Sequence, residues 1–212
     1  MKRNKTVFAA FALSIFYLVG IVGISLPGYK EQVLALSPLN LLLTFALFLY
    51  ANDSFTLKQY LALGLVYCFG FGIEVFGVKT GIVFGEYFYG ESLGLKLFEV
   101  PLIIGVNWLL LTLCTYSMFD SFLERKWIIT LCAASTMTVL DFMIEPVAIR
   151  IDFWHWEKDI IPIQNYIAWF IFSLLFVLLL SCFKLRINWR MSLIIIGLQF
   201  LFFGVLNLLL HQ

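Results

Sequence analysis

Apolar residues form seven runs along the chain, each near the length that a helix needs to cross about 30 Å of bilayer hydrocarbon. They lie at residues 7–26, 37–51, 57–77, 98–119, 127–149, 163–183 and 190–210. The second run, which begins at Ser37-Pro38, is the shortest. Because no long polar linker interrupts the series, the pattern predicts an all-α, polytopic membrane helical bundle with about seven transmembrane helices, forming a single domain over residues 1–212.

The composition agrees with a membrane protein and excludes some other classes. The chain is 62% hydrophobic and 13% charged, whereas ordinary globular domains are about 45–50% apolar and about 25% charged. A net charge of +1 gives no reason to expect nucleic acid as a partner. The cysteines lie in separate apolar runs without CxxC spacing, so we expect neither a metal site nor a disulfide framework: Cys68, Cys114, Cys132 and Cys182.

The first apolar run follows the basic segment at residues 2–5 and so resembles a signal peptide. However, the run is too long for a signal core and no A-x-A-like cleavage site follows it, so we interpret it as the first membrane helix. With the N-terminus in the cytoplasm, nine of the 14 Lys and Arg residues lie in cytoplasmic segments. This excess favours a cytoplasmic N-terminus, because cytoplasmic loops retain positive charge.

Three carboxylic side chains fall within the predicted spans: Glu74, Asp141 and Glu145. An ionisable group inside the bilayer is costly and is therefore a candidate for function. Asp141 and Glu145 are four residues apart, which places them about 6 Å apart on one helix face. Two carboxyl groups this close do not both ionise easily, so we expect one of them to stay protonated at neutral pH and to serve as a proton donor.

Other polar and aromatic residues are predicted to lie at the same depth as these carboxyl groups. Asn107 and Trp108 fall in the fourth span and Asn165 at the start of the sixth, while Tyr87, Trp154, His155 and Trp156 lie in two aromatic loops at residues 79–100 and 150–162. One interpretation is that these residues and the carboxyl groups form a shared functional site. Alternatively, the polar residues form hydrogen bonds that only join helices, and the aromatic residues anchor the helices at the membrane interface.

The order of these motifs resembles the membrane carotenoid biosynthesis family, which includes the carotenoid 1,2-hydratases of bacteria and the bisanhydrobacterioruberin hydratases of haloarchaea. The similar segments are residues 80–89 (TGIVFGEYFY), 100–102 (VPL) with 107–108 (NW), 141–148 (DFMIEPVA), 154–156 (WHW) and 161–170 (IPIQNYIAWF). They cover a core of about 70–170. Two departures are Glu145 before Pro146, where the family pattern has Asp, and Ile160 where it has Gly.

The resemblance implies that water is added across the terminal C1–C2 double bond of an acyclic carotenoid, giving a tertiary hydroxyl without a metal or another cofactor. We hypothesise that Asp141 or Glu145 is the general acid, and that the other carboxylate, or Glu74, activates the water. The Trp and Tyr rings would face the cation, the Asn amides would hold the water or tune the carboxyl groups, and His155 would relay a proton or be purely structural. We therefore assign substrate binding to seven residues: Trp108, Asn107, Tyr87, Trp154, Trp156, Asn165 and His155.

The substrates implied are lycopene, γ-carotene or a bacterioruberin precursor, within the cytoplasmic (inner) membrane of a bacterium or archaeon and alongside other carotenoid enzymes. A carotenoid end-group cyclase or isomerase is an alternative, because it shares the protonation step. A small proton-coupled transporter is another, although the chain lacks the internal repeat that many transporters have.

Overall fold

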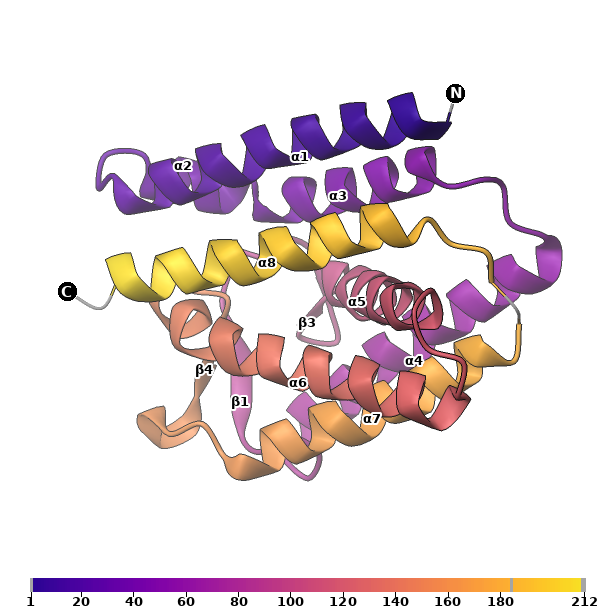
Figure 1. The fold of residues 1–212 in the computed structure, drawn as a ribbon. Coiled ribbons are helices and arrows are strands. Elements are labelled where there is room, and N and C mark those ends of the chain that lie inside the picture. The colour runs from indigo at the N-terminus through magenta and orange to yellow at the C-terminus, as the bar shows by residue number, and fades with distance from the viewer. Residues whose placement is uncertain (1, 184, 211–212) are drawn as a thin grey trace.

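The computed structural model describes residues 2–183 and 185–210. Helices make up most of this part of the chain (Figure 1). They are α1 (Lys2–Ser25), α2 (Lys30–Ala35), α3 (Ser37–Ala51), α4 (Leu57–Thr80), α5 (Ile103–Asp120), α6 (Lys126–Arg150), α7 (Ile163–Ser181) and α8 (Trp189–Leu209), with a short 3₁₀ turn at Glu157–Asp159. The prediction of an all-α polytopic bundle is confirmed.

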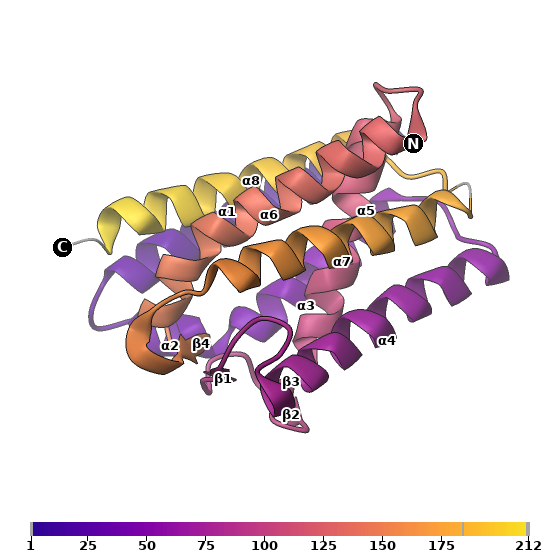
Figure 2. The same cartoon turned by 90° about the horizontal axis from the view of Figure 1, so that it is seen from below.

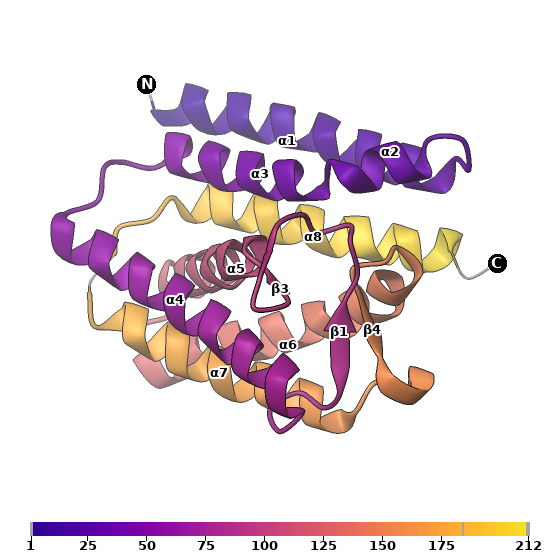
Figure 3. The same cartoon turned by 180° about the vertical axis from the view of Figure 1, so that it is seen from behind.

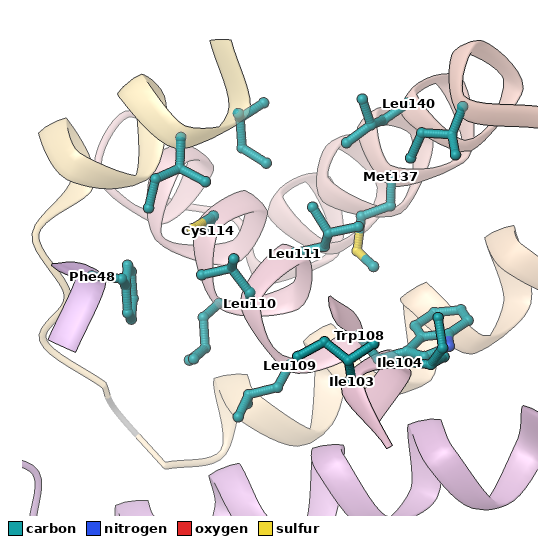
Figure 4. Packing of buried hydrophobic residues seen from close by; sticks show 14 of the residues in the cluster. Phe48, Ile103, Ile104, Trp108, Leu109, Leu110, Leu111, Cys114, Met137 and Leu140 are labelled. Carbon is teal, nitrogen blue, oxygen red and sulfur yellow. The ribbon is translucent and has the colours of Figure 1, made fainter. Parts of the chain in front are cut away.

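Helix α5 lies at the centre of the bundle, in contact with α3, α4, α6, α7 and α8 (Figures 1 and 2). Most of its residues are buried, from Ile103 to Ser117. Figure 4 shows Leu110 and Leu111 of α5 between Phe48 of α3 and Met137 of α6. These side chains are almost completely buried, so the core of the bundle is built around one central helix.

The outer surface of the bundle carries many large apolar side chains. Large side chains such as Phe11, Phe69 and Phe142 are more than half exposed, which water would not favour but lipid does. Six described helices are long and apolar enough to cross a membrane, and these are α1, α4, α5, α6, α7 and α8. The second predicted span is helix α3, whose 15 residues extend about 22 Å, less than the hydrocarbon thickness.

The ends of helix α4 are set by local sequence. Thr56 and Gln59 form a capping box, in which each side chain accepts a hydrogen bond from the backbone N–H of the other residue. The helix continues past the predicted end at residue 77 to Thr80 and stops at Gly81, which has a φ of 66°. A residue with a side chain is strained in this left-handed conformation. The cap carries the chain directly into the first aromatic loop.

Both aromatic loops contain short strands that the apolar pattern did not predict. Strands β1 (Tyr87–Tyr89) and β4 (Trp154–Trp156) pair antiparallel and join the two loops, as Figure 3 shows. Strands β2 (Lys96–Leu97) and β3 (Val100–Pro101) form a second pair. The chain from residue 96 to residue 101 is therefore strand and turn, and the helix predicted from residue 98 begins at Ile103. We call this end of the bundle the strand end.

Candidate functional site

The β1–β4 ribbon presents aromatic side chains to the helices by simple alternation. Tyr87 pairs with Trp156, and Tyr89 pairs with Trp154. Since successive strand residues point to opposite faces, these four rings lie on one face of the ribbon. Their hydroxyl and indole N–H groups are directed at carboxyl groups on helices α4 and α6.

Glu74 on α4 accepts three hydrogen bonds from side chains. Its Oε2 accepts from the hydroxyls of Tyr87 at 2.5 Å and Tyr89 at 2.7 Å, and its Oε1 accepts from Nε1 of Trp108 at 2.9 Å. The residue is only 4% exposed. Trp108 is held in turn by its stacking on Trp169 of α7, with ring centroids 4.1 Å apart. Residues of α5 and the ribbon therefore meet at this carboxyl group of α4, and α7 supports them through Trp169.

Glu145 on α6 also accepts three hydrogen bonds. Its Oε2 accepts from the indole N–H groups of Trp154 at 3.0 Å and Trp156 at 2.7 Å, and its Oε1 accepts from the amide of Asn165 at 3.0 Å. The same amide nitrogen donates to Oδ2 of Asp141 at 2.8 Å. Asn165 thus bridges the two carboxyl groups of α6, which are each 1% exposed.

Asp141 differs from the two glutamates in its surroundings. Its Oδ1 has no hydrogen-bond partner among the described residues, and Asp141 does not line either of the cavities described next. It shares the amide of Asn165 with Glu145, which agrees with the predicted placement of both carboxyl groups on one face of α6. The structure therefore places Glu74 and Glu145 at the smaller of the two cavities, and Asp141 at neither.

A small cavity of about 30 Å³ separates Glu74 from Glu145. It has room for about one water molecule. Its other lining residues are Phe84, Tyr87, Tyr89, Ile104, Asn107, Trp154, Trp156, Asn165 and Trp169. Two carboxyl groups and two amides thus face a space the size of a water molecule, and aromatic rings form most of its remaining wall.

A second cavity, of about 100 Å³, adjoins the first. The two share Ile104, Asn107 and Trp154 as lining residues. The larger cavity is mainly apolar, with walls that include Leu41, Leu93, Ile103, Ile144, Phe153, Phe202 and Phe203. Asn107, which the sequence singled out, lies between the two cavities.

His155 is the predicted site residue that the structure does not bring to the carboxyl groups. It occupies the other face of the ribbon, where its ring stacks on Phe88 with centroids 5.3 Å apart. Its Nε2 lies 2.8 Å from Oδ1 of Asp152, and Oδ2 of Asp152 accepts the backbone N–H of Glu91. The contact with His155 lowers the pKa of Asp152. This group joins the two loops outside the cavities.

Tyr87 and Tyr89 remain phenols over the physiological pH range. Burial raises the pKa of each hydroxyl well above 10, and the neighbouring Glu74 raises it further. Both hydroxyls therefore keep their protons. A phenol can accept a hydrogen bond as well as donate one, so these two partners can adapt to either protonation state of Glu74.

Several lining residues were not predicted. Tyr89, Phe84 and Trp169 line the small cavity, and Tyr89 follows the alternation that already included Tyr87. The larger cavity is also lined by polar residues of α1, α3 and α8, namely Tyr17, Ser37, Asn40, Thr44 and Gln199. The available signal was the few polar residues inside these apolar runs. Within the described chain, no group of three or more His, Cys, Asp or Glu side chains is arranged to hold a metal ion.

Comparison with known proteins places this chain in a family. Residues 36–212 match the family model described as carotenoid biosynthesis protein. The chain is 33% identical over 127 residues to the bisanhydrobacterioruberin hydratase of Haloarcula japonica, a match that covers 56% of this chain and 43% of that relative. The chain therefore matches less than half the length of the relative. No solved structure matches it. Because the family model spans most of the chain, this integral membrane protein belongs to the carotenoid biosynthesis protein family.

Proposed function

We propose that this protein is a hydratase that adds water across the terminal C1–C2 double bond of an acyclic carotenoid in the cytoplasmic membrane. The observation that carries the proposal is the water-sized cavity between Glu74 and Glu145, which adjoins a larger apolar cavity. A hydratase needs a proton donor, a proton acceptor and a positioned water next to an apolar substrate. The match to a hydratase relative supports the same reaction class.

The hydrogen-bond partners distinguish the two carboxyl groups at the small cavity. Glu145 is bound by the indole nitrogens of Trp154 and Trp156 and by an amide nitrogen. These groups only donate, so they favour a carboxylate, which only accepts. Two of the three partners of Glu74 are phenols, which can accept a hydrogen bond from a protonated carboxyl group as well as donate one to a carboxylate. We therefore assign Glu74 as the general acid and Glu145 as the base, whereas the sequence suggested an acid on α6.

The reaction then proceeds in two balanced steps. The carboxyl proton of Glu74 passes to C2, with the π electrons of the alkene forming the new C–H bond and C1 becoming a tertiary cation. The oxygen of the water in the small cavity bonds to C1, and a water proton passes to Glu145. The proton returns from Glu145 to Glu74 before the next turnover. The lining rings, including Tyr87, Trp154 and Trp156, face the cation, and each is worth about 0.5–2 kcal/mol.

The proposal is tested by expression in cells that make lycopene or γ-carotene, followed by pigment analysis by chromatography and mass spectrometry. We expect a product heavier by one water, and in deuterated water one deuterium at C2. Unchanged mass would contradict hydration and favour a cyclase or isomerase. Proton-dependent uptake without any pigment change would favour a transporter.

Variants then test the assignment of residues. Glu74→Gln and Glu145→Gln should each reduce conversion by about 100-fold or more, as expected for loss of a general acid or base. Glu157→Gln is the matched control, since Glu157 lies outside the cavities in the turn after β4. Wild-type conversion by both cavity variants would exclude the proposed chemistry even if the reaction were hydration.

A further inference from the structure

Helices α4 and α7 form an apolar groove of about 360 Å³ on one face of the bundle. Figure 2 shows the two helices running along this face. We call it the α4–α7 groove, and its lining residues are Phe69, Gly72 and Ile73 of α4 with Phe172, Leu175, Phe176 and Leu179 of α7. Phe69 and Leu175 are more than half exposed, so the groove opens toward lipid.

The groove is continuous with the wall of the candidate site. The ring of Phe172 contacts Phe84, with centroids 6.4 Å apart, and Phe84 lines the small cavity. The ring of Phe176 contacts Trp108, which donates to Glu74, at 5.4 Å. On α4, the groove residue Ile73 directly precedes Glu74. The rings of Phe84 and Trp108 therefore connect the groove residues to the small cavity and to Glu74.

The proposed substrate is far larger than the two cavities. Their volumes of about 30 and 100 Å³ accommodate an end group and one water, but not the polyene that carries it. From Asn165 at the small cavity to Leu179 at the far end of the groove, α7 advances 14 residues, or about 21 Å. A rod-shaped hydrocarbon can therefore lie along α7 while its end group reaches the acid.

We propose that the α4–α7 groove binds the polyene chain of the carotenoid and aligns it so that its terminal double bond enters between Phe84 and Phe172. This inference rests on the proposed function, because it takes the same substrate. It makes Gly72 a specificity-determining residue. A Cβ added at Gly72 would meet no atom within 4 Å, so a side chain at this position would occupy the groove itself.

Gly72→Leu tests the groove without disturbing the helix packing. Gly64→Leu is the matched control, because Gly64 lies on the same helix, is also free of neighbours within 4 Å, and does not line the groove. Each protein is reconstituted in phosphatidylcholine vesicles with lycopene, or with 2,6-dimethyloct-2-ene, a short alkene with the same terminal group. Lycopene binding is measured in parallel by quenching of tryptophan fluorescence.

We expect Gly72→Leu to weaken lycopene binding and raise its KM by about tenfold or more, while hydration of the short alkene stays within about twofold of wild type. Gly64→Leu should behave as wild type with both substrates. Two results would contradict the proposed role of the groove in binding the polyene. One is unchanged lycopene binding by Gly72→Leu, and the other is an equal loss of hydration activity with both alkenes. If the wild-type protein hydrates neither alkene, the proposed function is wrong. The binding measurement alone then tests whether the groove binds the polyene chain.

Discussion

Tyr89→Phe tests whether Glu74 is the acid, because it removes one hydroxyl and keeps the ring. The hydroxyl lies 2.7 Å from Oε2 of Glu74 in a buried setting. A hydrogen bond to a charged group contributes about 1.5–3 kcal/mol. If Glu74 becomes negative as it gives up its proton, this bond stabilises the transition state more than the ground state. With tenfold in rate for about 1.4 kcal/mol, kcat should fall roughly 10- to 150-fold.

The assay measures kcat and KM for lycopene hydration by protein in vesicles, together with thermal stability. Because the ring remains, KM should change little, and kcat and kcat/KM should fall together. Tyr60→Phe is the control, since Tyr60 is an exposed residue of the same helix α4, on which Glu74 lies. If Glu74 were instead the base, removal of a donor would make it more basic, and kcat would hold or rise. A folded Tyr89→Phe protein with such a kcat would refute the assignment.

Three further changes test the supports of the site. Gly90→Ala would place a Cβ 2.3 Å from the backbone oxygen of Asp152, so its thermal midpoint should fall by several degrees, whereas Gly28→Ala, with no atom within 4 Å, should leave it unchanged. Because the pKa of Asp152 is lowered in the folded protein, its ionised carboxylate stabilises the fold above about pH 4, the ordinary pKa of an aspartate. This stabilisation is lost as the pH falls through the lowered pKa. Asp152→Asn should abolish this acid-dependent loss, and an identical pH profile would contradict the role of the His155 contact. Asn165→Leu removes two hydrogen bonds to buried carboxyl groups and should cost about 1–3 kcal/mol in unfolding free energy, from about 0.6–1.7 for each bond inside membranes; an unchanged denaturation midpoint would contradict this.

The long helices were predictable from the sequence because bilayer thickness determines the length of an apolar run. The ends of the runs were less predictable. Helix α4 extends three residues beyond the expected end, since Lys79 and Thr80 are polar yet still helical before the cap at Gly81. The strands were missed for a different reason: β1 and β4 have three residues each and are far apart in the chain, so no local pattern shows their pairing.

The residues of the candidate site were easier to predict than their arrangement. Glu74, Asp141 and Glu145 stand out because carboxyl groups are rare inside apolar runs. Spacing on one helix drew attention to the pair Asp141 and Glu145, but the groups that face each other across the small cavity come from different helices. That relation depends on how α4 and α6 each pack against α5 and α7, and the spacing of residues along one helix does not show it.

The ribbon explains why carboxyl groups can be buried at the strand end at all. Of the six hydrogen bonds that Glu74 and Glu145 accept from side chains, four come from Tyr87, Tyr89, Trp154 and Trp156. Apolar helices cannot supply these donors without placing more polar groups in the membrane. A ribbon that pairs its own backbone groups can bring the phenol and indole donors in from the loops. The two carboxyl groups and the two loops therefore form one unit, and their hydrogen bonds depend on the pairing of β1 with β4.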